Sequence, residues 1–277
     1  MNTPLVAGLA ALAGIVIEGC LLFLLVNMLK ESGAVRKNFQ GIDIPVSAGL
    51  SFPMTVMLVF IGYRFFSWYD DSYQLFIFGL MSISFLGFID DMLGQRDTLG
   101  FKGHLGSLAR GKLTTGGLKA LGGGMIAFFL SLFIAGNTID IIINTLVMAL
   151  FTNMLNLLDL RPGRAVKGFI FFVVLLVVLA AARVDWLILA PLFGAVLYYF
   201  RLDLKAQVMM GDAGSNVLGL ALGFIAATNL NQVTRIGILV FLIAIHIYTE
   251  KYSLTDTINR VRLLRVIDQM GRRVSND

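Results

Sequence analysis

Long apolar runs alternate with short polar segments along almost the whole chain. Most of the runs have about the length that an α-helix needs to cross the hydrocarbon core of a bilayer. A soluble core has no room for so many runs, and the strands of a membrane barrel would alternate at every second residue. The pattern therefore predicts an all-α, polytopic membrane bundle. We expect about nine spans, at residues 6–29, 46–66, 74–89, 118–136, 139–157, 168–182, 186–200, 214–230 and 235–250, the seventh of which is short.

The composition agrees with a membrane protein. Of the 277 residues, 57% are hydrophobic and only 14% are charged, which is far more apolar than a soluble domain. The single cysteine, Cys20, lies inside the first run, so an intrachain disulfide is excluded. The N-terminus lacks the basic segment of a cleaved signal peptide, and we expect the first run to be retained as a span.

The basic residues predict the orientation of the bundle. All but three of the 22 Lys and Arg residues lie in alternate polar segments, and the exceptions are Arg64, Arg183 and Arg235. By the positive-inside rule, the N-terminus lies outside and the C-terminus lies in the cytoplasm. The net charge of +5 therefore needs no nucleic-acid partner. We divide the chain into a transmembrane domain, residues 1–250, and a basic amphipathic cytoplasmic tail, residues 251–277. The tail could lie on the anionic inner leaflet or cover a site.

Acidic residues collect at the predicted cytoplasmic ends of the spans. Asp90 and Asp91 end the third span, and adjacent carboxylates repel each other unless a cation or a proton lies between them. Magnesium is usually held by one or two carboxylates together with substrate phosphates. Asp212 precedes the eighth span between Gly211 and Gly214, which let a ligand approach the backbone closely. These acids, beside basic loops, predict a site for a metal and phosphates.

A polar stripe ends the fifth span. Asn153, Asn156 and Asp159 are spaced by one helical turn and therefore share one face of the helix. Such a stripe is costly against lipid, so we expect it to face a cavity or another helix. Ser215 is predicted to cap the eighth span, whose N-terminus would favour an anion. Glu18, an acid inside the first span, stays without an assigned role.

Five segments resemble, in order, the polyprenyl-phosphate N-acetylhexosamine-1-phosphate transferase family (glycosyltransferase family 4), which includes the phospho-N-acetylmuramoyl-pentapeptide transferase. They are Ile44-Pro45-Val46-Ser47-Ala48-Gly49, Asp90-Asp91, Lys119, Asn153-x-x-Asn156-Leu157-x-Asp159 and Met210-Gly211-Asp212-Ala213-Gly214-Ser215-x-x-Leu218-Gly219. Each segment alone is modest evidence, but the ordered set across residues 36–250 is specific.

The resemblance implies a magnesium-dependent enzyme of the cell envelope. It would transfer a sugar-1-phosphate, from a UDP-linked N-acetylhexosamine, to a membrane polyprenyl phosphate and release UMP. The family works at the cytoplasmic face of the plasma membrane, in bacteria above all, and a homodimer is compatible with it. The implied roles are catalysis and Mg²⁺ binding for Asp90, Asp91 and Asp212, and substrate binding for Asn153, Asn156, Asp159, Lys119 and Ser215, with Lys102 and Lys112 as weaker phosphate candidates. Arg161 and Arg164, which the family pattern lacks, could bind substrate by clamping a phosphate or could merely anchor the helix end.

The sequence departs from the family pattern at two places. After Asp159 the family usually continues Gly-x-Asp-Gly, whereas this chain has Leu160-Arg161-Pro162-Gly163-Arg164, so that an acid is replaced and two arginines are added. The last cytoplasmic loop lacks the family's histidine cluster, and a tenth span is missing. A non-catalytic relative that binds polyprenyl phosphate or envelope partners is therefore the alternative to an enzyme. A transporter fits less well, because the sequence shows no internal repeat and the acids gather at one membrane face.

Overall fold

The computed structural model describes residues 3–94, 111 and 113–272. The chain begins with α1 (Thr3–Glu31), a hairpin of β1 (Val35–Lys37) and β2 (Asp43–Pro45), and the short η1 (Ala48–Leu50). The long helices that follow are α2 (Ser51–Phe65), α3 (Ser72–Leu93), α5 (Thr115–Ile134), α6 (Thr138–Leu158), α7 (Arg164–Leu179), α8 (Trp186–Leu204), α9 (Asp212–Asn229) and α10 (Gln232–Lys251). Two short helices, α11 (Leu254–Arg260) and α12 (Arg262–Gln269), complete the described part.

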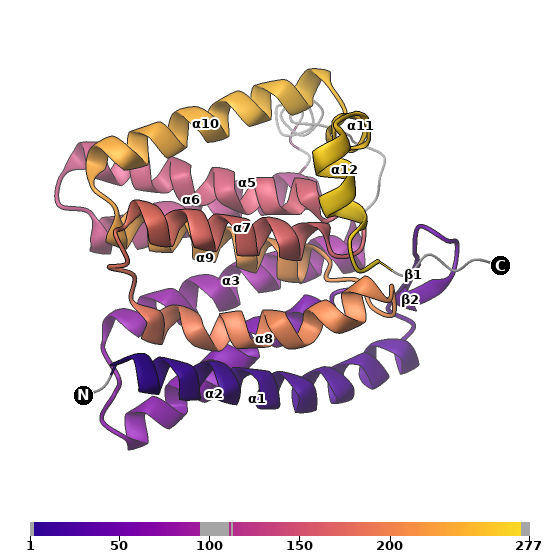
Figure 1. Ribbon diagram of the computed structural model, residues 1–277, viewed down its shortest axis with the longest axis horizontal. Helices are drawn as coiled ribbons and strands as arrows, with labels where there is room; N and C mark the ends of the chain where they lie inside the picture. The colour runs from indigo at the N-terminus through magenta and orange to yellow at the C-terminus, as the bar shows by residue number, and fades with distance from the viewer. Residues whose placement is uncertain (1–2, 95–110, 112, 273–277) are drawn as a thin grey trace.

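The long helices run roughly alongside one another and form one bundle (Figure 1). The β1–β2 hairpin, α11 and α12 all lie at the same end of this bundle, opposite the N-terminus. We call it the basic end, because it carries Arg36, Lys37, Arg161 and Lys251 among its cations. Predicted phosphate ligands Lys102 and Lys112 lie outside the described residues.

The predicted all-α membrane bundle is confirmed. Seven helices of the described chain are long and apolar enough to cross a membrane, namely α1, α2 with η1, α3, α5, α6, α8 and α10. The predicted spans 168–182 and 214–230 correspond to α7 and α9, which do not meet the same criteria of length and composition. The short seventh span proved to be a helix of 19 residues, because α8 continues through the charged residues Arg201 and Asp203.

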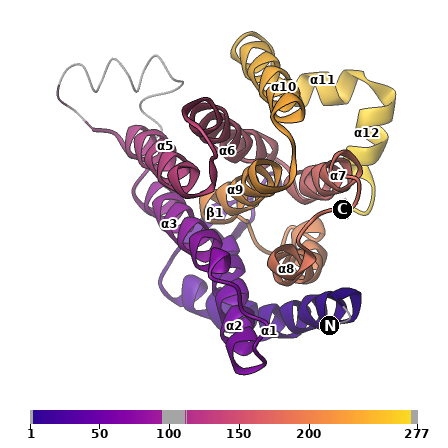
Figure 2. The ribbon, with the colours of Figure 1, turned by 90° about the vertical axis from the view of Figure 1, so that its left-hand side faces the viewer.

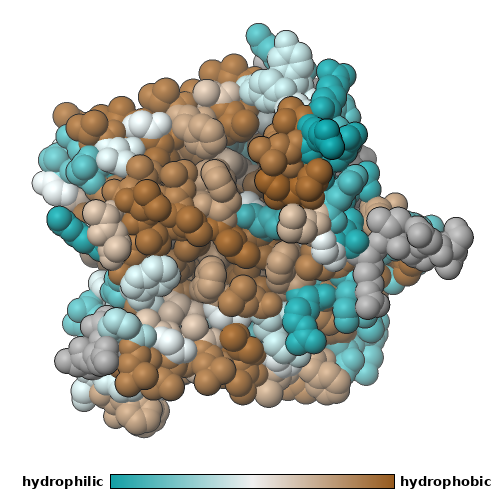
Figure 3. Space-filling view, in the orientation of Figure 1, coloured by the Kyte–Doolittle hydropathy of each residue, from teal (hydrophilic) through white to brown (hydrophobic). Residues whose placement is uncertain are grey.

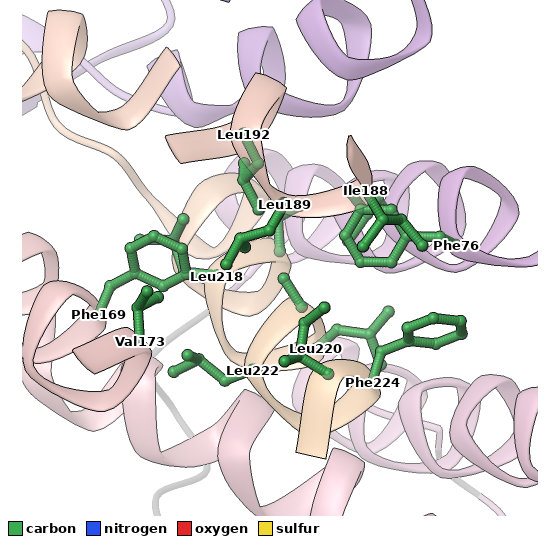
Figure 4. Close-up of a cluster of buried hydrophobic side chains, with 14 of the residues drawn as sticks. Phe76, Phe169, Val173, Ile188, Leu189, Leu192, Leu218, Leu220, Leu222 and Phe224 are labelled. Atoms are coloured by element: carbon green, nitrogen blue, oxygen red, sulfur yellow. The ribbon is translucent and has the colours of Figure 1, made fainter. Parts of the chain in front are cut away.

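Helix α9 occupies the middle of the bundle. Every residue from Ala213 to Ala227 is buried, and α9 packs against α3, α6 and α7 (Figure 2). A helix that is buried on all sides needs small or apolar residues all round, and α9 has that composition. Its side chains meet those of α3, α7 and α8 in a continuous apolar cluster that includes Phe76, Phe169, Leu189 and Leu218 (Figure 4).

Glu18 is hydrogen-bonded to side chains inside the bundle. Its side chain is fully buried between α1 and α2, where it accepts hydrogen bonds from Ser51 Oγ at 2.5 Å and Thr55 Oγ1 at 2.7 Å. A buried carboxyl group that is hydrogen-bonded in this way ties two membrane helices together. The described structure therefore gives Glu18 a role in packing rather than at the site below.

Candidate active site

A cavity of about 1130 Å³ opens at the basic end of the bundle. Its wall comes from the hairpin, from the ends of α3, α6, α8 and α10 that lie there, and from the starts of α5 and α9. The residues that line it include the predicted site residues Asp90, Asp91, Lys119, Asp159 and Asp212. The predicted acids, which are separated by as much as 122 positions in the sequence, thus reach one cavity.

Lys119 links two of these acids. Its Nζ donates to Asp90 Oδ2 at 3.1 Å and also to Asp212 Oδ2. The three side chains are each about one-fifth exposed, so that they remain reachable from the cavity. One ammonium group between two carboxylates neutralises part of the charge that would otherwise push them apart. The cluster is a compact group of cation and anions at the junction of α3, α5 and α9.

Asn156 extends this cluster. The orientation of its amide that satisfies all neighbours has the nitrogen donating to Asp212 Oδ1 at 2.9 Å and the oxygen accepting from Lys119 Nζ at 3.1 Å. The same amide lies 3.2 Å from Ser215 Oγ. Ser215 itself is fully buried behind the cluster. Asn156 therefore connects the polar stripe of α6 to both Lys119 and Asp212.

Asp91 points away from its neighbour Asp90 and caps α9. Its Oδ1 accepts from the backbone N–H of Asp212 at 3.0 Å, and its Oδ2 accepts from that of Ala213 at 3.2 Å. Ser47 Oγ also donates to Oδ2, at 2.6 Å. The first N–H groups of a helix lack partners within the helix, and a carboxylate there also interacts favourably with the helix dipole.

The prediction that Ser215 caps this helix is therefore wrong. The N-cap is Gly211, whose side chain offers no oxygen, and Asp91 supplies the missing acceptor from α3. Gly211 has a φ of 70°, and a Cβ atom there would lie 2.3 Å from Asp91 Oδ2. Close approach also requires Gly87, where a Cβ atom would lie 2.3 Å from the carbonyl oxygen of Asp212.

Asp159 lies at the end of α6, in the wall of the cavity. Withdrawal from bulk water raises the pKa of this carboxyl group well above its usual range, and the negative charges of Asp203, Asp212 and Asp91 add to the effect. A bound cation would interact with the ionised carboxylate of Asp159, whereas a hydrogen-bond acceptor of a ligand would bind to its protonated form. Asn153, nearly two turns earlier on the same helix, is exposed and also lines the cavity.

The two arginines of the unusual α6–α7 turn have different environments. Arg161 lines the cavity, where its guanidinium lies 5.4 Å from the ring centroid of Phe39 in the hairpin loop. Arg164 begins α7, is 5% exposed and forms a two-point ion pair with Asp268 of α12, with Nε to Oδ1 at 2.8 Å and Nη2 to Oδ2 at 3.2 Å. The buried guanidinium of Arg164 is thus held by the tail and is absent from the cavity lining.

The site also contains residues to which the sequence gave no role. Ser47 holds Asp91, and Arg36 Nη2 donates to the backbone carbonyl of Asp91 at 3.2 Å. Asp203, at the end of α8, lines the cavity and accepts from the backbone N–H of Gly163 at 2.8 Å. Only Ser47 had a signal in the sequence, because it belongs to the first of the five resembling segments.

A comparison with known families decides the assignment. The model of the family described as Glycosyl transferase family 4 matches residues 73–231, which is more than half of the chain. The chain belongs to this family. The matched region contains Asp90, Asp91, Lys119, Asp159 and Asp212, and it ends before α10 and the tail. A search of curated proteins finds no match. The family supports a transferase of the kind that moves a sugar-1-phosphate to a polyprenyl phosphate.

Proposed function

We propose that this protein transfers a sugar-1-phosphate from a UDP-sugar, in particular a UDP-N-acetylhexosamine, to a membrane polyprenyl phosphate in the synthesis of envelope glycans. The observation that carries the proposal is the Asp90–Lys119–Asp212 cluster in the wall of a large cavity at the basic end. By the positive-inside rule we place this end in the cytoplasm, where nucleotide sugars are made, and the lipid substrate would enter from the surrounding bilayer.

The reaction joins two anions. An oxygen of the lipid phosphate would attack the β-phosphorus of the donor, and the bond from that phosphorus to the bridging oxygen would break, so that UMP leaves. A site for such a step must position both phosphates and balance their negative charge. Lys119 lies where it could bind a phosphate oxygen, and Arg161 could hold a second one at the cavity wall.

The acids fit a magnesium ion in this role. No group of three or more His, Cys, Asp and Glu side chains in the described residues is arranged to hold a metal by itself. Mg²⁺, however, commonly takes one or two protein carboxylates and completes its shell with phosphates and water. Asp90 and Asp212 already hold one cation, the Lys119 ammonium, between them. We propose that they hold Mg²⁺ when substrate is bound, where it would neutralise charge that develops on the transferred phosphate.

The remaining predicted residues take separate parts in the proposal. Asn153 and Asp159 would contact the nucleotide from the wall formed by α6, and Asn156 would hold Asp212 and Lys119 in place. Asp91 would act by fixing the start of α9, and so the position of Asp212. In the same way, Ser215 and Arg164 would support the site from behind, since neither belongs to the cavity lining.

Release of UMP tests the proposal. Purified protein in lipid, with Mg²⁺ and undecaprenyl phosphate, is offered a panel of UDP-sugars. The test variant is Asp212→Asn at the cluster. Its matched control is Asp71→Asn, which changes an exposed acid before α3. We expect UMP release with at least one donor, its loss in Asp212→Asn and its retention in Asp71→Asn. Protein that binds the lipid phosphate but releases no UMP from any donor would overturn the proposal and favour the non-catalytic relative.

A further inference from the structure

Helix α12 has its polar and apolar sides reversed relative to a surface helix of a soluble protein, because an acid faces the protein and apolar residues face outward. Its one buried residue is the acid Asp268, which points at the rest of the protein. Its exposed residues include Leu263, Val266 and Ile267, and Met270 continues the same face one residue beyond the helix end. At 100° per residue these four apolar side chains lie within about one-third of the helix circumference, opposite the polar side. Water would disfavour such an arrangement.

The position of α12 explains this reversal. Helices α11 and α12 run across the end of the bundle, whereas the long helices run along its length (Figure 1). If the long helices cross a bilayer, α12 lies roughly in the plane of the membrane at its surface. A hydrophobic patch appears at its place in the space-filling view, bordered by hydrophilic residues (Figure 3). A helix with an apolar face and cationic neighbours at this level is typical of a membrane interface.

The charges near α12 select the kind of surface. Arg260, Arg262 and Arg265 are all exposed. At 100° per residue Arg262 borders the apolar face, whereas Arg265 lies on the opposite, polar side of α12. Asp268, the one acid of α12, is paired with Arg164. Asp256 lies one turn before Arg260 on α11, but the exposed arginines outnumber this acid, and a surface with such an excess of cations is attracted to the anionic lipids of the inner leaflet. Neutral lipid would cover the apolar face but would not balance the charge of the arginines. A soluble acidic partner would balance that charge but would leave the apolar face in water.

We propose that α12 is an interfacial helix, with its apolar face among the acyl chains of an anionic leaflet, and that this contact positions the α6–α7 turn at the cavity. The first part stands on the structure of the tail alone. The second part rests on the proposed function, because the turn matters only if the cavity is an active site.

The link from α12 to the turn is continuous. Asp268 binds Arg164 at the start of α7, and Lys167 Nζ donates to the carbonyl oxygens of Asp268 and Met270 at 2.8 and 2.7 Å. Arg272 Nη2 donates to the carbonyl oxygen of Pro162 at 3.0 Å. Pro162 follows Arg161, and both line the cavity, so a displacement of α12 would be transmitted to a cation of the site.

Fluorescent labels on the full-length protein test the membrane contact. In a Cys20→Ser background, one variant carries Ile267→Cys and its matched control carries Gln269→Cys, which is exposed on the polar side of the same helix. Each is labelled, placed in bilayers with a lipid-borne quencher, and compared in anionic and neutral lipid. We expect strong quenching at position 267 in anionic lipid, its loss in neutral lipid, and little quenching at position 269.

Equal quenching at the two positions, or none at either, would overturn the membrane contact. So would disulfide cross-linking between two copies of the Ile267→Cys protein in place of quenching, because the apolar face would then belong to a dimer. Insensitivity of the quenching to lipid charge would overturn the choice of an anionic surface.

The coupling is tested with the double variant Leu263→Gln/Ile267→Gln, whose side chains lie outside the cavity. In anionic proteoliposomes we expect a fall in UMP release of up to about 100-fold, the scale found when a site group is displaced. In this test the label is carried by Met270→Cys, because the double variant replaces Ile267. Unchanged release, with this label no longer quenched, would overturn the coupling. If the proposed function is wrong, no variant releases UMP, yet the labels still report on α12.

Discussion

Asp90 and Asp91 are adjacent acids, and the structure predicts different consequences when each becomes asparagine. Asp90→Asn should lower turnover, whereas Asp91→Asn should lower stability. Asp91→Asn changes the acceptor that caps α9. If the amide oxygen keeps its bond to the Asp212 N–H, the amide nitrogen replaces Oδ2 and faces the N–H of Ala213, which is a second donor. Ser47 Oγ can rotate and accept instead of donating. One backbone N–H is therefore left without a partner, and a negative charge is removed from the helix start.

The magnitude follows from these losses. An unsatisfied backbone N–H costs about 1–3 kcal/mol, and loss of a charge at a helix N-terminus costs about 0.3–1 kcal/mol. We expect Asp91→Asn to lower the free energy of unfolding by about 1–4 kcal/mol. For a chain of this size, that corresponds to a fall in Tm on the order of 3–10 °C. Asp90 accepts from Lys119 in the partly exposed cluster, so Asp90→Asn should change Tm by less than about 3 °C.

The assay compares the two variants in the same detergent. Thermal unfolding is followed by tryptophan fluorescence, and UMP release is measured well below either Tm. We expect Asp90→Asn to keep its stability and lose turnover, whereas Asp91→Asn loses stability. A Tm for Asp91→Asn equal to that of the unchanged protein would refute the reasoning, because it would mean that Asp91 does not cap α9.

Two further predictions concern other charged contacts. Lys119→Gln leaves the carboxylates of Asp90 and Asp212 without their shared cation, and we expect UMP release to fall about 10²–10³-fold, measured beside the exposed control Lys205→Gln. Burial opposes ionisation of Asp268, but the hydrogen bonds and charge of Arg164 outweigh it and hold the pKa of this carboxyl below its ordinary value. The contribution of this ion pair is therefore complete above about pH 4 and is lost as the pH falls through the lowered pKa. Limited proteolysis should release the tail only at such acidic pH, and Asp268→Asn should expose it at pH 7; a tail equally protected in that variant would argue against the ion pair as its anchor.

Hydropathy could predict the bundle because a membrane helix must satisfy its backbone internally and face lipid with apolar side chains. The same signal failed at the end of α8, where the charged residues suggested that the span stops. The helix continues because Asp203 is buried and has a fixed partner, the N–H of Gly163. That partner lies 40 residues away in the sequence, and no local pattern indicates it.

The arginines of the α6–α7 turn show a second limit. From the sequence, both could either clamp a substrate phosphate or merely anchor the helix end. In the structure Gly163, with a φ of 77°, reverses the chain between them, so that Arg161 stays at the cavity and Arg164 starts a new helix. The carboxylate that binds Arg164 belongs to the tail, 104 residues further on. Only the folded chain shows that one arginine faces the site and the other anchors α12.

The sequence predicted that Asp90 and Asp91 share one cation because their charges are adjacent. Successive residues of a helix point about 100° apart, however, so two neighbouring carboxylates need not face one ligand. Asp90 turns to Lys119, and Asp91 turns to the start of α9. Asp212, the first residue of α9, is thereby fixed from behind by the second acid and brought beside the first. With these two adjacent acids, α3 both contributes to the cluster and holds Asp212 in position.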